Sequence, residues 1–461
     1  MLDRKKRNMN SPDHSVSVSN VPVRRAGTGE ARDLAEINTR RNAVREPERR
    51  VEGEGREVLL ARRGIDPVYF ILVLVLLLFG GIMVFSASYA DAQTRFGDSF
   101  YFAKKQFLFV GMAMVIMPVV AAFPYRYFYR FSYLTYLFTV GMLVLVLVIG
   151  FASGGAQRWF SVGPISVQPS EIAKVTLVFA LARYTSDHRD RVLDRSPVER
   201  RYKHPRRAGL FPALGASLYN VFIAAPRAFV TYMWRGIGPQ LCLLAVIDVL
   251  VAAEKHISGL VIITALAMLV MYYAGTRLSC LAAVAGVGVA GVALLIAKFS
   301  YATQRVNVWL HPENYKLEGG WQTIQGGFAI GSGGLFGLGL GNSRLKYSYV
   351  SMPQNDFVFT IVCEELGFIG AVAVIALFAA LVARGFYIAK KAPDTFASTV
   401  AFGISVHIAI QVLLNIAVVT NTIPNTGISL PFFSYGGSSL LVLAAEMGVM
   451  LSISRYSYIR K

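Results

Sequence analysis

FILVLVLLLFGGIMVF, at residues 70–85, decides the fold class, because it is a continuous apolar run without a charged side chain. A second such run, LVLVLVIGFA, occupies residues 143–152. Each approaches the roughly 20 residues that a helix needs to cross a bilayer. The chain of 461 residues is 54% hydrophobic and 16% charged, whereas about 25% of the residues of soluble proteins are charged. These values exclude an ordinary cytosolic enzyme and predict a polytopic membrane protein.

Several windows along the chain are apolar enough to form membrane spans. They cover residues 68–87, 105–123, 132–152, 170–184, 237–252, 257–275, 279–298, 357–384, 397–420 and 436–454. We therefore expect an all-α polytopic membrane protein with about ten transmembrane helices. A large structured external loop is expected between helices 7 and 8.

The net charge is +19, and the excess Lys and Arg residues lie between the spans. This distribution indicates membrane topology and not a nucleic-acid partner. Residues 1–66 carry 15 Lys and Arg against 11 Asp and Glu, and residues 183–235 carry 11 against 4. Loops rich in Lys and Arg favour the cytoplasmic side of a membrane. An even number of spans then places both termini in the cytoplasm. Residues 153–169, 300–355 and 421–434 are expected outside.

The same pattern divides the chain into parts. Residues 1–66 are predicted to be a disordered basic cytoplasmic tail, and residues 457–461 a cytoplasmic C-terminus. The transmembrane domain, residues 67–456, includes a cytoplasmic or interfacial insertion at 185–236 and the external loop at 300–355. No cleavage site follows the first apolar run, so the first span is expected to remain as an anchor. The three cysteines have no paired spacing and indicate neither a disulfide framework nor a metal site.

The first external loop reads GGAQRWFSVGPISVQPSEIAK at residues 154–174. Glu171 and Lys174 are three residues apart at the start of a span, so they share a helical face and can form an ion pair. With Arg158 they have two open interpretations. They are snorkelling residues at the membrane interface, or they form a cationic site for an anionic lipid headgroup.

The second candidate is Asp356, at the external end of the eighth predicted span. Glu364 and Glu365 follow roughly 12 Å deeper along the helix. Ionisable groups at that depth are costly unless they are paired or face a polar cavity, so they are candidates for function. The alternative is that Asp356 caps the helix and the glutamates pair with interior cations. The residue types leave both interpretations open.

The two remaining polar loops are less specific. Residues 319–357 are rich in Gly, Gln and Asn, which suits irregular backbone lining a wet cavity, and no strand-helix-strand unit supports a dinucleotide site. Residues 423–441 contain two prolines and Gly436-Gly437, which predict a structured re-entrant loop. Other polar groups within spans are more typical of helix packing than of catalysis. They are Asp248, Glu254, His256, His407 and Glu446.

Five ordered segments together resemble a known family. They are SAS (86–88), QRW with QPSEIAK, AIGSGGLFGLGLGNS, NDFVFTIVCEELGFIG and PNTGISLPFFSYGGSSLL. In this order they are similar to the SEDS proteins of bacterial shape, elongation, division and sporulation, namely FtsW, RodA and SpoVE. The resemblance covers residues 67–456. GLGLGNS (337–343) resembles the division and sporulation members more than RodA.

The resemblance implies a peptidoglycan glycosyltransferase that polymerises lipid II at the outer face of the bacterial plasma membrane. Its implied partners are a class B penicillin-binding protein, which is a transpeptidase, and other division or sporulation proteins. By motif, Asp356 corresponds to the family's external carboxylate, the proposed general base. Arg158, Glu171 and Lys174 fall in the QRW and QPSE motifs, and Ser434 falls in the SYGG motif, which implies substrate binding.

The implied reaction is an attack by the acceptor sugar's C4 hydroxyl on the anomeric carbon of a lipid-pyrophosphate donor. Asp356 would take the hydroxyl proton, while Arg158 and Lys174 stabilise charge on the departing pyrophosphate. A divalent cation, Mg²⁺ or Mn²⁺, is compatible with this chemistry. The sequence assigns no ligands to it.

Three departures from the family pattern stand out. The family's HTDF is QNDF here (354–357), so no histidine assists the aspartate. EPDLG is replaced by EKHISG (254–259), which puts a metal or substrate role of that acidic residue in doubt. The stretch at 185–236 is longer than usual.

Two other functions compete with the glycosyltransferase. A flippase or transporter of the lipid-linked precursor also has about ten spans, intramembrane charges and glycine-broken segments. It would need polar sites reachable from both faces, whereas the richest polar cluster here is external. A noncatalytic division scaffold would leave Asp356 unexplained.

Overall fold

The structure is a computed structural model in which Leu60–Lys461 forms one compact unit. It describes residues 59–60, 64–153, 156–162, 165–193, 225–298, 300–316, 319–347 and 352–459. Most of the predicted tail (1–66) and the middle of the predicted insertion (194–224) lie outside the described residues.

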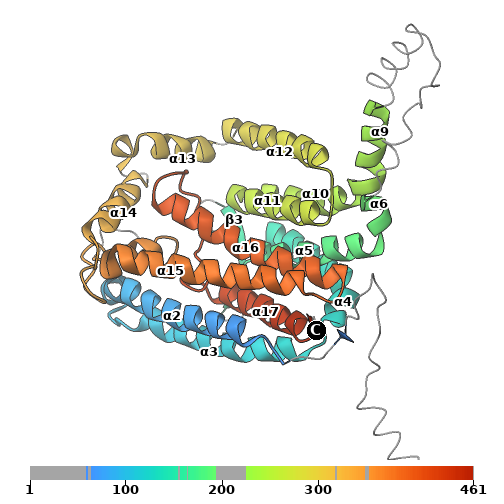
Figure 1. Ribbon diagram of the computed structural model, residues 1–461. Coiled ribbons are helices and arrows are strands. Elements are labelled where there is room, and N and C mark those ends of the chain that lie inside the picture. Colours follow the sequence, from blue (N-terminus) through green and yellow to red (C-terminus); the bar gives the residue numbers. More distant parts are fainter. Residues whose placement is uncertain are drawn as a thin grey trace, which may run out of the picture. The chain divides into compact units, whose positions relative to one another are not determined.

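Helices make up most of the described chain (Figure 1). The α-helices are α2 (Pro67–Phe96), α3 (Tyr101–Ala122), α4 (Tyr125–Ile149), α5 (Pro169–Asp187), α6 (Arg189–Leu193), α9 (Ala225–Tyr232), α10 (Gly238–Ala253), α11 (Ile257–Tyr273), α12 (Leu278–Lys298), α13 (Ser300–Leu310), α14 (Gly320–Ser332), α15 (Val358–Lys390), α16 (Thr395–Val419) and α17 (Gly437–Ser454). A π-helix, η2 (Met233–Ile237), joins α9 to α10, and a 3₁₀-helix, η3 (Pro312–Asn314), follows α13. The strands are β1 (Leu59–Leu60), β2 (Phe151–Ser153), β3 (Ala156–Val162), β4 (Ile165–Val167) and β5 (Tyr458–Ile459).

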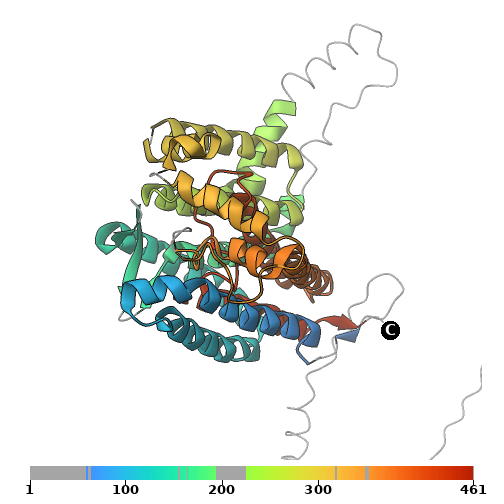
Figure 2. The ribbon, with the colours of Figure 1, turned by 90° about the vertical axis from the view of Figure 1, so that its left-hand side faces the viewer.

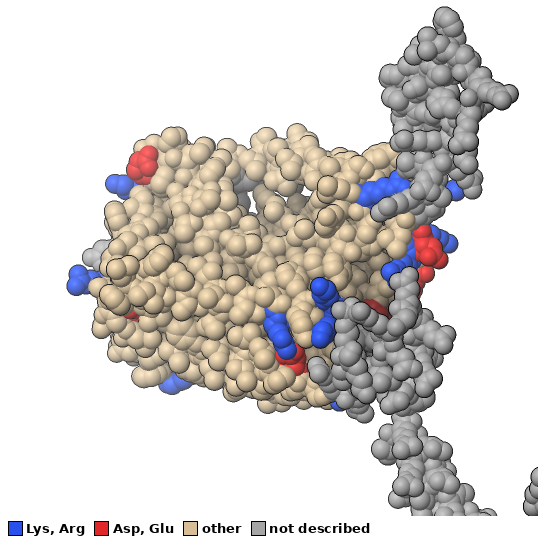
Figure 3. All heavy atoms as spheres, viewed as in Figure 1, with Lys and Arg blue, Asp and Glu red and all other residues tan. Residues whose placement is uncertain are grey.

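The predicted fold class is confirmed. Within the described ranges, eight helices are long and apolar enough to cross a membrane. The two other predicted spans correspond to α5, which carries Glu171 and Lys174, and to α11, an apolar helix of 17 residues. The flank shown in Figure 3 is almost free of charge, and the charged side chains lie towards the two ends, as a lipid-facing surface requires.

The helices pack around a central group. Figure 2 shows α15, α16 and α17, in orange and red, between α2 and α3 on one side and α10 to α12 on the other. This central position explains the burial of α16 and α17, whose apolar windows are 61% and 72% buried. The outer helix α12 is 12% buried.

Asp66 fixes the start of α2 and ties it to two other helices. Its side chain accepts a hydrogen bond from the backbone N–H of Tyr69, and Pro67 occupies the first helical turn. The same carboxylate accepts from Arg384 of α15 at 2.8 Å, and the Asp66 amide donates to Ser454 of α17. These contacts hold the ends of α2, α15 and α17 together.

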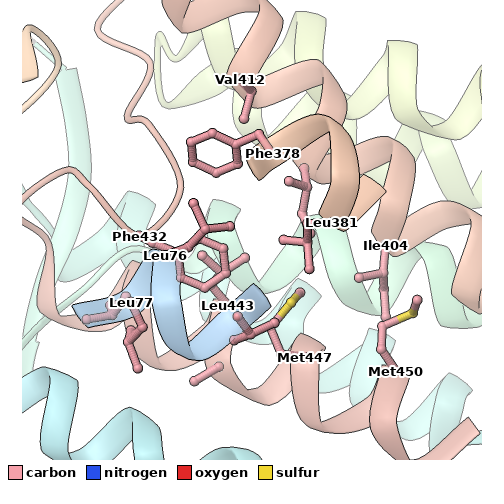
Figure 4. Close-up of a cluster of buried hydrophobic side chains, with 14 of the residues drawn as sticks. Leu76, Leu77, Phe378, Leu381, Ile404, Val412, Phe432, Leu443, Met447 and Met450 are labelled. Atoms are coloured by element: carbon pink, nitrogen blue, oxygen red, sulfur yellow. The ribbon is translucent and has the colours of Figure 1, made fainter. Parts of the chain in front are cut away.

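The re-entrant loop after α16 is anchored in the main hydrophobic core. Phe432 and Phe433 are 3% and 0% exposed. Figure 4 shows Phe432 among Leu76, Phe378 and Leu443, which come from three different helices. The sequence PFF therefore holds the loop in place through apolar burial, as the prediction of a structured loop requires.

The long segment between α12 and α15 contains α13, η3 and α14, and its glycine-rich part packs on α15. The backbone of α15 is kinked at Gly367 (φ 68°, ψ −168°), a conformation that glycine adopts without a steric penalty. Gly337 (φ 79°) crosses this kink so closely that a Cβ on it would lie 2.2 Å from the backbone oxygen of Glu365. The amides of Leu338 and Gly339 donate to the carbonyls of Glu364 and Glu365. These glycines were predicted to line a wet cavity, but they serve close backbone packing.

A three-stranded antiparallel sheet covers the start of α5. β3 pairs with β2 and with β4, in a register that sets Phe160 opposite Val167. This sheet presents Trp159 and Ser166 to the cavity described next.

Candidate active site

One large cavity, here called the outer cavity, opens where the three predicted external loops meet. Its volume is about 600 Å³, within the range of about 300–1,000 Å³ typical of ligand pockets. Its polar wall includes Arg95, Lys105, Gln168, Glu171, Lys174, His256, Asp356, Gln411 and Ser434. Trp159, Met352 and Gly427 line it from the three loops, so these loops share one end of the molecule, as predicted.

Asp356 lies in the wall of the outer cavity, directly before α15. The helix begins after Phe357 without a side-chain cap, so the alternative that Asp356 caps it is wrong. A Cβ built on Gly427 would lie 3.7 Å from Asp356 Oδ2, which places the carboxylate against the re-entrant loop. Burial raises the pKa of Asp356, while its own backbone N–H and the Arg305 guanidinium oppose that rise. A raised pKa brings a carboxylate closer to the range useful for a general base.

Asn415 of α16 connects the two segments that frame this carboxylate. Its side chain is fully buried. The Nδ2 atom donates to the Asp356 backbone oxygen at 2.8 Å and to the Ile428 backbone oxygen at 2.7 Å. A rigid helix thus fixes the spacing between the Asp356 segment and the re-entrant loop.

Gln354 occupies the position at which the family pattern has histidine. Its side chain is 2% exposed, and Nε2 donates to Asp91 Oδ2 at 3.0 Å. Asp91 also pairs with Arg95 at 2.6 Å, and the Gln354 carbonyl accepts from the Tyr435 amide. Gln354 therefore joins α2 to the segment that carries Asp356, without contacting the Asp356 carboxylate through a described hydrogen bond.

The ion pair predicted between Glu171 and Lys174 is present. Lys174 Nζ lies 2.8 Å from Glu171 Oε2, and the lysine side chain is 3% exposed. Both residues line the outer cavity, so the pair faces the ligand space and not the lipid. An ammonium group has three N–H donors, of which one points to Glu171.

Ser434 lies where the motif placed it, in the outer cavity wall. Its Oγ accepts from the Leu430 amide at 2.7 Å, which closes a tight turn in the re-entrant loop. The serine thus shapes the loop as well as the cavity.

Arg158 is not among the residues that line the outer cavity. It lies near Glu254 and His256, at the turn between α10 and α11. Burial raises the pKa of Glu254 to about 8, against the opposing charge of Arg158. Burial, then Arg158, lower the pKa of His256 to about 3. The substrate-binding role of Arg158 stays a prediction.

Glu364 and Glu365 are bound to the glycine-rich loop and lie away from the outer cavity. Glu364 accepts from the Ser343 hydroxyl and the Arg344 amide. Glu365 accepts from Ser86 at 2.7 Å and pairs with Lys346 at 3.1 Å. The interpretation that the glutamates pair with interior cations is therefore supported for Glu365.

The cavity does not contain a preformed metal cage. Among the residues that the structure describes, no group of three or more His, Cys, Asp and Glu side chains could hold a metal ion. The carboxylates of the outer cavity are Asp356 and Glu171, and Glu171 is occupied by Lys174. A divalent cation would need ligands from the substrate.

Three residues at the site, Arg95, Lys105 and Asn415, were not predicted from the sequence. Arg95 and Lys105 stand near the ends of predicted spans, where charged residues commonly anchor a helix at the interface. Asn415 is a single amide inside an apolar helix, which is typical of helix packing. No local pattern separates these residues from such neighbours.

The comparisons with known proteins agree with the geometry. The family model named FtsW/RodA/SpoVE and described as "Cell cycle protein" matches residues 67–459. The chain is 36% identical over 394 residues to stage V sporulation protein E of Bacillus subtilis, with 85% of this chain and 97% of that protein covered. It is 32% identical over 393 residues to the probable peptidoglycan glycosyltransferase FtsW of a Geobacter species, with the same coverage.

Solved structures show the same fold. The rod shape determining protein RodA of Thermus thermophilus superimposes with a TM-score of 0.57 at 24% identity, covering 85% of this chain and 97% of that one. A chain from a peptidoglycan synthase complex superimposes with a TM-score of 0.62 at 24% identity, covering 85% and 98%. The family match over residues 67–459, together with these relatives, shows that the chain belongs to the FtsW/RodA/SpoVE family of cell cycle proteins.

Proposed function

We propose that this protein is a peptidoglycan glycosyltransferase that polymerises lipid II at the outer face of the bacterial plasma membrane. The observation that carries the proposal is the outer cavity, in which the Asp356 carboxylate shares one polar space with Lys174, Arg95 and Lys105. Several relatives are named probable peptidoglycan glycosyltransferase. A base beside several cations suits a substrate that carries both a hydroxyl nucleophile and a pyrophosphate leaving group.

Asp356 acts as the general base in this proposal. The acceptor's C4 oxygen forms a bond to the donor's anomeric carbon, and its proton passes to the Asp356 carboxylate. The bond between the anomeric carbon and the pyrophosphate oxygen breaks, and its electron pair leaves with the lipid pyrophosphate. Burial around Asp356 supports this role because it raises the pKa of the carboxyl.

The cations of the outer cavity bind the pyrophosphate. Lys174 is held by Glu171 and keeps N–H donors for a phosphate oxygen. Arg95 and Lys105, from α2 and α3, add positive charge to the wall of the outer cavity. Donors fixed where negative charge develops stabilise the transition state. We assign pyrophosphate binding to Lys174, Arg95 and Lys105. Arg158, near the turn between α10 and α11, stays a predicted substrate-binding residue.

A divalent cation, Mg²⁺ or Mn²⁺, is part of the proposal. Asp356 would supply one carboxylate, and the phosphate oxygens of the substrate would supply further ligands, since Mg²⁺ commonly combines carboxylates with substrate phosphates. Such a cation would neutralise charge on the leaving group.

We further propose a class B penicillin-binding protein as partner, a role in division or sporulation, and a topology with both termini in the cytoplasm. The topology is supported by the Lys and Arg excess outside the membrane spans on the side opposite the outer cavity. The partner is supported by the structural likeness to a chain from a peptidoglycan synthase complex that coordinates polymerization and crosslinking.

The proposal is tested with the purified full-length protein in lipid nanodiscs, with and without the partner transpeptidase. Fluorescent lipid II is supplied, and glycan chains are resolved on a gel while lipid movement between leaflets is followed by quenching. We expect glycan chains. Lipid movement without glycan chains would identify a flippase instead and overturn the proposal.

A further inference from the structure

A second, smaller cavity, here called the inner cavity, adjoins the outer cavity on its inward side. Its volume is about 20 Å³. Its polar wall includes Glu171, His407, Gln411, Ser434, Ser439 and Glu446. Glu171, Gln411, Ser434 and Ser439 also line the outer cavity, so the two spaces share a wall.

Two buried polar atoms in this wall lack a partner. His407 Nδ1 lies 2.9 Å from Glu446 Oε2, which joins α16 to α17. The residues are 4% and 1% exposed. Within the described part of the chain, His407 Nε2 and Glu446 Oε1 have no hydrogen-bond partner. Buried polar atoms are nearly always hydrogen-bonded, to protein or to ordered water.

Ser434 offers a third group to the same space. Its Oγ accepts from the Leu430 amide, and its hydroxyl hydrogen has no acceptor among the described residues. If His407 Nδ1–H donates to Glu446, then His407 Nε2 is an acceptor. The inner cavity therefore presents two acceptors and one donor, which matches the hydrogen-bonding capacity of a water molecule.

The size of the inner cavity fits the same ligand. A polar cavity of roughly 10–15 Å³ or more holds one water molecule, which typically makes about three hydrogen bonds. The inner cavity is too small for a lipid headgroup or a sugar. No metal-binding group of three His, Cys, Asp or Glu side chains occurs in the described chain, which disfavours a dedicated cation site.

We propose that the inner cavity binds one water molecule, which donates to His407 Nε2 and Glu446 Oε1 and accepts from the Ser434 hydroxyl. This water connects the His407–Glu446 pair to the floor of the outer cavity. His407 and Glu446 are then positioning residues for Ser434 and for the neighbouring Glu171–Lys174 pair. The functional consequence rests on the proposed function, because Lys174 binds the pyrophosphate of lipid II there.

The first test is a structure of the full-length protein at a resolution that shows ordered water. We expect a density peak at about 2.7–3.2 Å from each of the three atoms. An empty inner cavity in a well-ordered map would overturn the proposal, as would a peak surrounded by oxygen ligands at cation distances. This test decides the water site even if the protein does not polymerise lipid II.

The second test measures kcat and KM for lipid II in variants of the inner cavity. Val442→Ile adds one methyl group to a residue that lines the inner but not the outer cavity, and so displaces the water without removing a polar group. Glu446→Leu removes the acceptor. For both we expect KM to rise about 3- to 10-fold with kcat changed less, because a misplaced Lys174 weakens pyrophosphate binding.

Two further variants separate positioning from general damage. Glu446→Gln keeps hydrogen-bonding groups in the inner cavity, so its KM should stay close to the wild-type value. Val372→Ile makes the same methyl addition at a residue of α15 that is 46% exposed and should change nothing. An equal rise in KM for Glu446→Gln and Glu446→Leu would show that the charge of Glu446 matters and not the bound water. That result would overturn the positioning role. So would a wild-type KM in Val442→Ile.

Discussion

Asn415 Nδ2 donates to the backbone oxygen of Asp356 at 2.8 Å, and the same amide nitrogen donates to Ile428 at 2.7 Å. The candidate base and the re-entrant loop are therefore fixed to one buried side chain of α16. The position of Asp356 relative to the re-entrant loop is therefore set by the packing of α16. Changes at Asn415 should act on catalysis without removing any group that contacts substrate.

Asn415→Asp keeps the shape of the side chain but replaces the donor by an oxygen that repels both carbonyls. We expect kcat for lipid II polymerisation to fall on the order of 10- to 10²-fold, since a displacement near 1 Å can cost that much. Ser405→Ala, a buried change in the same helix whose hydroxyl bonds within α16, is the control. Comparable losses in both variants, measured below their melting temperatures, would refute the positioning role.

Arg305 should contribute to the pH dependence of the reaction. Asp356 acts when deprotonated, so activity rises with pH through its pKa, which burial holds above the ordinary value of about 4. Arg305 opposes that rise, so Arg305→Gln should move the acid limb of the kcat/KM profile to higher pH, and Arg305→Lys should move it less. A limb that stays in place or moves to lower pH would contradict the assignment.

Lys346→Met should destabilise the fold strongly. It leaves the Glu365 carboxylate buried and unpaired, and breaking a buried pair costs about 3–5 kcal/mol. Thermal unfolding in detergent measures the loss, and the double variant Lys346→Met/Glu365→Gln should recover part of it. Lys104→Met, which breaks an exposed pair with Asp98, should melt close to wild type. Equal melting of the two single variants would show that the buried pair does not hold the loop.

Gly337→Ala tests the crossing of the glycine-rich loop over α15. The new Cβ would lie 2.2 Å from the Glu365 oxygen at a φ of 79°, so we expect a loss of roughly 1–3 kcal/mol from backbone strain, with a further steric contribution. Gly327→Ala is the matched control, because no atom lies within 4 Å of its Cβ in helix α14. A melting temperature for Gly337→Ala as high as that of the control would contradict the close crossing of the glycine-rich loop over α15.

The apolar runs were sufficient to predict the membrane-spanning helices, because a bilayer imposes a length and a composition on each span. The alternation of basic loops predicted that three of the other loops share one end, and residues of all three line the outer cavity. The kink at Gly367 could not be predicted, because it depends on a backbone crossing with Gly337, which is 30 positions away. Helix α5 was identified although Glu171 and Lys174 make it polar, and these residues turned out to face the outer cavity.

The candidate site was only partly predictable. Asp356, Glu171, Lys174 and Ser434 do line one cavity, whereas Arg158 does not. A motif records which residues recur but not which way each side chain points, and β3 turns Trp159 and not Arg158 to the cavity. The partners of Glu364 and Glu365 could not be predicted, since Ser343 lies 21 positions before Glu364 and Lys346 lies 19 positions before Glu365, both in a loop.

The most direct test of the general base is Asp356→Asn, assayed with the partner transpeptidase, lipid II and a divalent cation. Asn keeps the size of the side chain but cannot accept the proton, so polymerisation should fall by roughly 10²- to 10⁴-fold while the protein still folds and binds its partner. Glu313→Gln, in the segment between α12 and α15 and 61% exposed, should keep wild-type activity. Robust polymerisation by Asp356→Asn would contradict the account and move the proton acceptor to another group.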